Sequence, residues 1–159
     1  MITAEIIGDK QVIAKLNNFA PRMREQILFS TRRLEFMMVA KVKQKLSGEV
    51  LKNRTNHLRG SIHGEVKDSG NLIEGVTGTN VVYARIHEEG GKTAPHEIRP
   101  KNTLALHFML GGREVFAKVV HHPGSKIPQR SFLASSLREM RPTIIEEYEK
   151  ATAEVIKNG

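Results

Sequence analysis

Cysteine and tryptophan are absent from this 159-residue chain, and aromatic residues make up only 5% of it. Without cysteine the chain can form neither disulfides nor thiolate metal sites, which fits a reducing compartment. No apolar run approaches the roughly 18 residues of a membrane-spanning helix. Residues 1–8 also lack the basic start and the long apolar stretch of a signal peptide. We therefore expect a protein that is made in the cytoplasm and has no membrane partner.

Acidic residues are fewer than basic ones: the chain has 17 Asp and Glu against 25 Lys and Arg, which gives a net charge of +8. A basic chain favours acidic partners, and nucleic acid is the commonest of these. The alternative is that the basic side chains only solvate helix faces, because they are spread along the chain with few aromatic residues between them to stack on bases. The candidates for facing DNA lie in a polar connector over residues 49–59: Lys52, Arg54 and Arg59.

Motifs for catalysis and metal binding are also missing. The chain has no Gly-x-Ser-x-Gly, P-loop or dinucleotide fingerprint, and its seven histidines include no His-x-x-x-His pair. The neighbours His121 and His122 would point to opposite faces of a strand. Glu88 and Glu89 beside His87 are more typical of a solvated helix end than of an acid–base pair. We predict no catalytic residue, metal site or cofactor; the spacing disfavours the remaining alternative, a metal-dependent enzyme that uses His87 with His121 or His122.

The N-terminal third is predicted to be mainly helical. Residues 2–8 alternate like a short strand, and a short helix is expected over residues 9–19. Pro21 suits the first turn of a longer helix that ends near Leu46. The apolar positions of this longer helix follow steps of four and seven, which predicts one stripe facing a core: Met23, Ile27, Leu34, Met38, Val42 and Leu46.

Two hairpins are predicted in the middle of the chain. Alternation over residues 60–77, interrupted by the turn sequence Asp68-Ser69-Gly70-Asn71, predicts the first. Residues 103–121 alternate on either side of Gly111-Gly112 and predict the second. The apolar side of the second hairpin carries residues at alternate positions: Leu104, Leu106, Phe108 and Leu110.

Between and after the hairpins, the pattern changes again. A short helix is expected over residues 81–89, and a mobile loop at about residues 90–102, where two glycines and two prolines occur. Residues 133–155 keep helical spacing, which Pro142 should break or kink. The sum is an α+β fold, with one antiparallel sheet of two hairpins packed against the long N-terminal helix, and a C-terminal helix. We expect a single domain over residues 1–159.

Two short segments carry the clearest motifs. The first is Tyr83-Ala84-Arg85-Ile86-His87-Glu88-Glu89-Gly90-Gly91. The second runs from His122 to Leu133 and contains a Pro-Gly turn, a second proline, an arginine and then a Phe-Leu pair that opens a helix. The order of these segments is more informative than either one alone.

Together with Leu58-Arg59-Gly60-Ser61-Ile62 and the second hairpin, these segments make the chain resemble the tail-completion (virion morphogenesis) proteins of long-tailed bacteriophages, over about residues 10–157. Two positions depart from the family pattern. Glu89 stands where the family often has an aromatic residue, and Ser131 where it often has proline. These departures leave the subfamily open.

The resemblance implies a structural phage or prophage protein of the head–tail joint or tail end, and no enzymatic reaction. It implies a homo-oligomeric ring in the virion tail or neck, made in the bacterial host cytoplasm, that binds the connector and the tail-tube or tail-terminator proteins; contact with passing DNA stays open. Arg130 is expected to bridge an acidic group, with Glu88 as the candidate. The implied interaction residues are Tyr83, His87, Glu88, Gly90, Gly91, Arg99, Lys101, Arg130 and Phe132.

Overall fold

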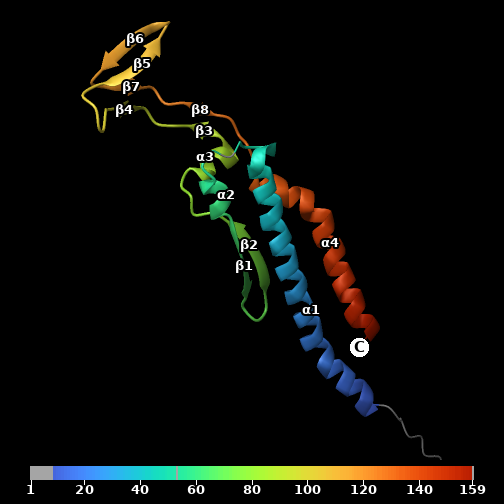
Figure 1. Cartoon of the computed structure of the whole chain (residues 1–159). Helices are drawn as coiled ribbons and strands as arrows, with labels where there is room; N and C mark the ends of the chain where they lie inside the picture. The colour runs from blue at the N-terminus through green and yellow to red at the C-terminus, as the bar shows by residue number, and fades with distance from the viewer. Residues whose placement is uncertain (1–8, 53, 159) are drawn as a thin grey trace, which may run out of the picture. The chain divides into compact units, whose positions relative to one another are not determined.

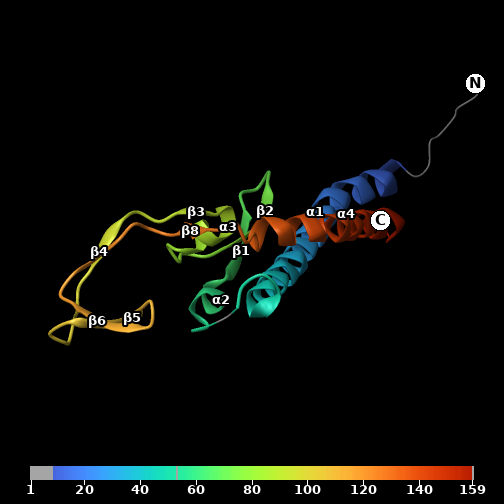
Figure 2. The same ribbon diagram turned by 90° about the horizontal axis from the view of Figure 1, so that it is seen from above.

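The computed structural model describes residues 9–52 and 54–158, and the chain divides into two compact units. The first, which we call the helical unit, is formed by the chain up to Val81 and from Ser131 onward. The second, the strand unit, comprises Val82–Arg130. Each unit has its own set of helices and strands (Figures 1 and 2).

Two long helices lie side by side in the helical unit (Figure 1). Helix α1 spans Asp9–Gln44 and continues into a π-helical turn, η1, at Lys45–Glu49, while α4 spans Leu133–Asn158. The core of this unit lies between these helices and the segments beside them. Each aliphatic side chain buried there stabilises the fold by about 1.5–3 kcal/mol. The apolar residues buried in this unit are Leu34, Val42, Leu46, Ile62, Phe132, Met140, Ala151 and Val155. The predicted apolar stripe is therefore confirmed at Leu34, Val42 and Leu46.

Both helices run through a proline, which corrects two predictions. The short helix and the longer one expected to begin at Pro21 form one continuous helix, and Pro142 does not end α4. A proline inside a helix removes the hydrogen bond to the carbonyl one turn earlier. Pro21 and Pro142 are exposed, as are Asn17 and Arg138 one turn before them, so water can reach the freed carbonyls. The cost of each interruption is thereby reduced.

A hairpin packs on α1 in the helical unit. Strand β1, His63–Asp68, pairs antiparallel with β2, Ile73–Gly78, and the predicted first hairpin is confirmed. The Thr77 hydroxyl donates to the Glu35 carboxylate of α1 at 3.3 Å, and Arg24 of α1 donates to Asp68 and to the Gly70 carbonyl at the turn. A helical turn, α2 at His57–Ser61, precedes the hairpin where the sequence predicted a connector and a strand start.

The strand unit begins with the predicted short helix, α3 at Ala84–Glu89. Its chain then runs out through β3, Gly91–Lys92, β4, His96–Ile98, and β5, Leu106–Leu110. It returns through β6, Arg113–Ala117, β7, Val120–His122, and β8, Lys126–Ile127. Each outgoing strand pairs antiparallel with a returning one: β3 with β8, β4 with β7 and β5 with β6. The unit is therefore one long two-stranded ladder with interruptions.

The α+β class, the hairpins and both terminal helices are confirmed, but the hairpins do not share one sheet. In the described residues the strands form separate two-stranded sheets. The longest interruption has a simple cause in the register: residues 99–105 lie opposite only residues 118 and 119. The segment 90–102 contains β3 and β4, so much of its backbone is paired, and its mobility stays a prediction. The predicted strand over residues 2–8 lies outside the described residues, and the single domain stays a prediction.

Candidate assembly interface

The base of the strand unit is built around α3. The Tyr83 ring stands edge-on to the His87 ring, with centroids 6.1 Å apart, and Tyr83 is 43% exposed. The backbone N–H of Arg130 donates to the His87 carbonyl at 2.7 Å, which ties the end of the unit to its beginning. The Arg130 side chain is exposed, and its expected ion pair with Glu88 stays a prediction. The matched sequence segments therefore meet here through backbone contacts.

Gly90 and Gly124 allow the outgoing and returning chains to approach closely. Gly90 ends α3 with a φ of +75°, and a Cβ there would lie 2.9 Å from the Gln129 backbone nitrogen. Gly124 has a φ of +86°, and a Cβ there would overlap the Thr93 carbonyl oxygen. Thr93 and Ser125 bond across this point, with the Thr93 N–H donating to the Ser125 carbonyl at 2.9 Å. Gly90 and Gly124 therefore permit a close approach that a larger residue would prevent.

The interruption over residues 99–105 exposes both predicted basic residues of this region. Arg99 pairs with Glu97 at 2.7 Å, and Lys101 is exposed. Leu104 is 97% exposed, which is unusual for a leucine and leaves it available to a partner. The exposed Lys101 and Leu104 thus lie close together in the sequence, on a segment that is longer than the strand segment opposite it.

The β5–β6 hairpin carries an apolar face with nothing of its own sheet to cover it. The register places Leu106, Phe108 and Leu110 beside Ala117, Val115 and Arg113 on one face. We call the apolar members of this set, Leu106, Phe108, Leu110, Val115 and Ala117, the hairpin apolar face. Leu110 is 66% exposed, the other four members are half-buried, and the sheet has only two strands in the described part of the chain. An isolated two-stranded hairpin is marginal in water, so this face favours a partner.

The other face of the same hairpin differs in character. His107 stacks on Phe116, with ring centroids 4.7 Å apart, and Met109 is 61% exposed. Further along the ladder, His122 stacks on His96 while His121 lies 3.5 Å from Glu97 on the opposite face. This arrangement matches the expectation that the neighbouring histidines point apart. Among the described residues, no group of three or more His, Asp or Glu could hold a metal ion.

The remaining predicted residues lie in the helical unit. Phe132 is fully buried there, so its side chain contributes to the core. Lys52 and Arg54 are exposed. Arg59 is half-buried, and its Nη1 donates to Asn56 at 3.2 Å. The structure thus separates Phe132, Lys52, Arg54 and Arg59 from the other predicted residues, which all belong to the strand unit.

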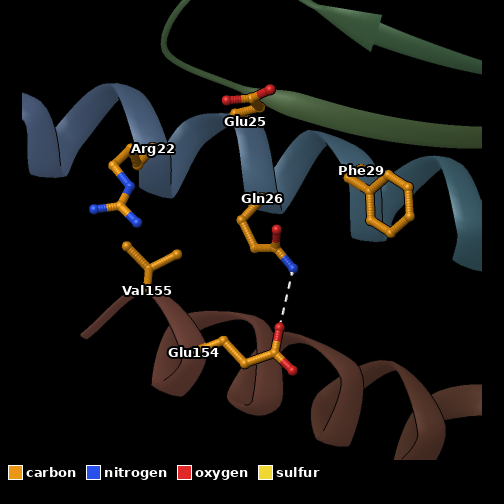
Figure 3. Close-up of a pocket in the computed structure, with 6 residues that line it drawn as sticks. All are labelled: Arg22, Glu25, Gln26, Phe29, Glu154 and Val155. Carbon is orange, nitrogen blue, oxygen red and sulfur yellow. Dashed lines mark hydrogen bonds between the residues drawn. The ribbon is translucent and has the colours of Figure 1, made fainter. Parts of the chain in front are cut away.

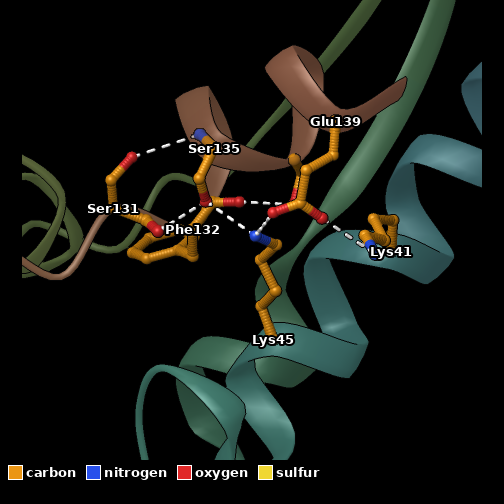
Figure 4. A network of polar contacts seen from close by, with 7 residues as sticks. Lys41, Lys45, Ser131, Phe132, Ser135 and Glu139 are labelled. Atoms are coloured by element: carbon orange, nitrogen blue, oxygen red, sulfur yellow. Dashed lines mark hydrogen bonds and ion pairs between the residues drawn. The ribbon is translucent and has the colours of Figure 1, made fainter. Parts of the chain in front are cut away.

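A buried cation lies at the α1–α4 contact, and no pattern in the sequence indicated it (Figure 4). Lys45 is 3% exposed, and its ammonium donates to the Ser135 hydroxyl at 3.0 Å and to the Glu139 carboxylate. Lys41 pairs with the same carboxylate at 2.9 Å. The hydrogen bond from Lys45, and then that from Lys41, holds the pKa of Glu139 below its usual range. This network anchors the start of α4 on the end of α1.

No helix in the described residues is long and apolar enough to cross a membrane. The profile of the phage virion morphogenesis family matches residues 34–156, which is more than half of the chain. Comparisons with curated proteins and with solved structures give no significant match. The matched span includes most of α4 and the whole strand unit, and the resemblance noted in the sequence is confirmed. The chain therefore belongs to the phage virion morphogenesis family and is a phage structural or assembly protein.

Proposed function

We propose that the protein is a tail-completion subunit of the head–tail joint or tail end, which acts as part of a ring by protein–protein binding. The observation that carries this proposal is the hairpin apolar face, presented by a two-stranded ladder in a family of virion assembly proteins. Burying such a face against another subunit gives a hydrophobic contribution that the ladder lacks by itself. The unpaired edges of the strands offer further backbone donors and acceptors to a partner.

The expected partners are copies of the same chain, the phage connector and the tail-tube or tail-terminator proteins. Arg99, Lys101 and Leu104 lie on the interrupted segment next to the hairpin and would extend the contact with polar and apolar groups. Tyr83, Gly90 and Arg130 lie at the base of the strand unit, where they set its geometry. The binding role requires no reaction and no cofactor.

Electron microscopy of phage lysates tests the proposal. A null allele should give filled heads and separate tails, and complementation should restore joined particles. Leu110→Asp should fail to restore joining, because it places a charge on the hairpin apolar face. Met109→Asp is the matched control: it changes the adjacent residue, with similar exposure, on the opposite face, and should restore joining. Intact infectious particles from the null allele would overturn the proposal.

A second candidate function, nucleic-acid binding, is favoured by the net charge of +8 and by the exposure of Lys52 and Arg54. Contacts with phosphates release counterions, so such binding would weaken steeply as salt rises. Fluorescence anisotropy with duplex and single-stranded DNA over a salt series measures this slope. The double variant Lys52→Glu with Arg54→Glu should lower the slope if these residues face DNA, and leave it unchanged if they only solvate the surface.

A further inference from the structure

We propose that His122 is an acid-sensitive latch in the strand unit: its neutral ring holds a backbone turn closed, and protonation of the ring releases that turn. The inference goes beyond the proposed function and does not depend on it, because every contact that carries it lies within one chain. It concerns the start of the second sequence motif, His122-Pro123-Gly124, to which the proposed function gives no role.

The His122 side chain closes a turn over Pro123. The backbone N–H of Gly124 donates to Nδ1 of His122 at 3.0 Å. A backbone N–H can only donate, so Nδ1 accepts through its lone pair, and the neutral ring carries its hydrogen on Nε2. Pro123 has no N–H, so Gly124 supplies the first backbone donor after His122. The bond is the histidine counterpart of an Asx turn, in which a side chain bonds to its own backbone two residues on.

This turn lies where the outgoing and returning chains come close together. Gly124 has a φ of +86°, and a Cβ there would overlap the Thr93 carbonyl oxygen. Beside it, the Ser125 N–H donates to the Thr93 hydroxyl at 2.7 Å, and the Thr93 N–H donates to the Ser125 carbonyl at 2.9 Å. The β3–β8 and β4–β7 pairs flank this point. Gly124 is therefore at the junction between two pieces of the ladder, and the His122 ring bonds to that junction.

Protonation of His122 removes the acceptor that the turn uses. A proton taken up from solvent can bind only at Nδ1, because Nε2 already carries hydrogen in this tautomer. Nδ1 then becomes a donor that faces a second donor, the Gly124 N–H, and the bond between them is lost. Histidine is the side chain whose charge ordinarily changes between about pH 8 and about pH 5. The turn should therefore be closed at the upper end of this range and released at the lower end.

His96 adds to this response from the facing strand. Its ring stacks on the His122 ring, with centroids 5.0 Å apart and an interplanar angle of 27°. Its Nδ1 lies 3.2 Å from the Ala94 carbonyl oxygen, which can only accept, so Nδ1 carries the hydrogen and a further proton binds at Nε2. Protonated His96 therefore keeps its own bond, but two charged rings would then face each other. Like charges directly opposite on paired strands destabilise the pairing.

The charged groups on the opposite face of the same strands have a weaker effect. His121 lies 3.5 Å from Glu97, and Glu97 also pairs with Arg99 at 2.7 Å. Protonation of His121 strengthens its pair with Glu97 and so favours the β4–β7 rungs in acid. The His121 side chain is 79% exposed, however, and solvent screens a pair of this kind. The loss of the bond to Gly124 should therefore decide the response of the ladder.

The neighbouring β3–β8 pair contributes further positive charge. Lys92 lies directly opposite Lys126 in the register, and both are exposed. On each strand the lysine is four residues from the stacked rings. Within the described residues neither stacked ring forms an ion pair with a carboxylate, whereas His107 and His121 each lie beside one. A proton gained by either stacked ring thus adds to a local excess of positive charge.

NMR spectroscopy of the isotope-labelled, purified full chain tests the latch directly. Between about pH 8 and about pH 5, the Gly124 amide proton should move upfield together with the titration of the His122 ring, because it loses its acceptor. His122→Asn should abolish this movement, since asparagine offers an uncharged oxygen that accepts from the N–H two residues on. A Gly124 amide that does not follow His122 in wild type, or that moves equally in His122→Asn, would overturn the proposal.

The helical unit supplies an internal reference for the same spectra (Figure 3). A groove of about 360 Å³ lies between α1 and α4, where the Gln26 amide donates to the Glu154 carboxylate at 3.4 Å. The described residues that line this groove include no histidine: Arg22, Glu25, Gln26, Phe29, Glu154 and Val155. The Gln26 side-chain amide should therefore keep its resonance positions between about pH 8 and about pH 5. Equal movement of the Gln26 and Gly124 signals would indicate a change in both units and would contradict a local latch.

Limited proteolysis measures what the latch does to the ladder. Cleavage within residues 90–102 should be about threefold to tenfold faster at about pH 5.5 than at about pH 7.5, the factor expected when the closed form loses one hydrogen bond. Casein digested in parallel corrects for the pH dependence of the protease. His122→Asn should remove the difference between the two pH values. Cleavage of wild type that does not depend on pH would overturn the proposal.

His121→Asn is the matched control for the proteolysis. It makes the same chemical change at the adjacent position, whose side chain lies on the opposite face of the strand and makes no bond to Gly124. This variant should keep the faster cleavage in acid. Acid sensitivity that disappears in His121→Asn, or that is the same in His122→Asn as in wild type, would show that the His122 ring is not the latch.

Discussion

The buried apolar side chains are distributed unequally between the helical unit and the strand unit. Of the apolar residues buried in the described chain, Ala84 alone belongs to the strand unit, and all the others belong to the helical unit. The strand unit instead carries short ladders, three stacked or edge-on ring pairs and glycines at points of close approach. The comparison teaches that one unit is stabilised by a core of its own, whereas the other holds its shape with almost no fully buried apolar side chain.

The two hairpins differ from each other in the same way, since only one of them packs against a long helix. The β1–β2 hairpin is anchored on α1 by Arg24 and by Glu35, so one of its faces has a helix against it. The β5–β6 hairpin has a similar length, but Leu110 and Met109 are both more than half exposed. A hairpin that is covered within its unit contributes to the fold, and one that is uncovered is suited to binding.

The largest expected effect comes from breaking the core of the helical unit. Phe132→Ala should destabilise the protein by about 3–5 kcal/mol, because it leaves a cavity at a fully buried position. Urea unfolding followed by circular dichroism measures this change. Phe116→Ala in the strand unit is the control: its ring is 68% exposed, so its effect should stay within about 0.5 kcal/mol. Equal losses from both variants would contradict the division between the units.

A smaller effect is expected at the buried Lys45. Glu139→Gln should lower the melting temperature at neutral pH, because the Lys45 ammonium would lose the carboxylate that pairs with it. The pKa of Glu139 is lowered in the folded state, so its contribution is present above the ordinary value of 4.5 and is lost as pH falls through the folded pKa. The gap in melting temperature between wild type and Glu139→Gln should therefore shrink in acid.

Glu146→Gln serves as the control for this pH dependence, since it makes the same chemical change at an exposed position of the same helix. It should leave the melting temperature unchanged at both pH values. A gap between wild type and Glu139→Gln that stays constant from neutral to acidic pH would show that the carboxylate charge contributes nothing there.

The third effect is local to the strand unit. Gly124→Ala should loosen the β3–β8 end of the ladder, because a Cβ would overlap the Thr93 carbonyl and φ is +86°. Limited proteolysis should then cut residues 90–102 faster, while the melting of the helical unit changes little. Gly111→Asn is the control, since asparagine tolerates a positive φ and that position has open space around it. Unchanged protease resistance of Gly124→Ala would contradict the role given to this close approach.

Local patterns predicted the elements better than they predicted their surroundings. Helical spacing indicated that Leu34, Val42 and Leu46 share a buried stripe, and alternation placed Leu106 and Phe108 on one hairpin face. These predictions depend on residues a few positions apart. They say which side chains share a face but not what lies against that face.

The predictions that failed depend on distant partners or on solvent. The rule that proline ends a helix did not hold at Pro142, because its side of α4 faces water. The burial of Lys45 could not be inferred, since its partner Glu139 lies 94 residues away in the sequence. The prediction that both hairpins share one sheet is wrong, because alternation identifies the strands of a hairpin but not the neighbours of that hairpin: β1 and β2 form one two-stranded sheet, and β5 and β6 form another.

The smallest expected effect tests why the β1–β2 hairpin differs from the β5–β6 hairpin. Arg24→Ala removes the ion pair with Asp68 and the bond to the Gly70 carbonyl, yet both partners are partly exposed, so the loss should be roughly 0.2–1 kcal/mol. Packing against α1 and the bond from Thr77 to Glu35 should keep the hairpin in place. Hydrogen exchange should therefore quicken at the turn and stay slow near Thr77. Fast exchange along the whole hairpin would mean that Arg24, and not packing on the helix, makes this hairpin part of the fold.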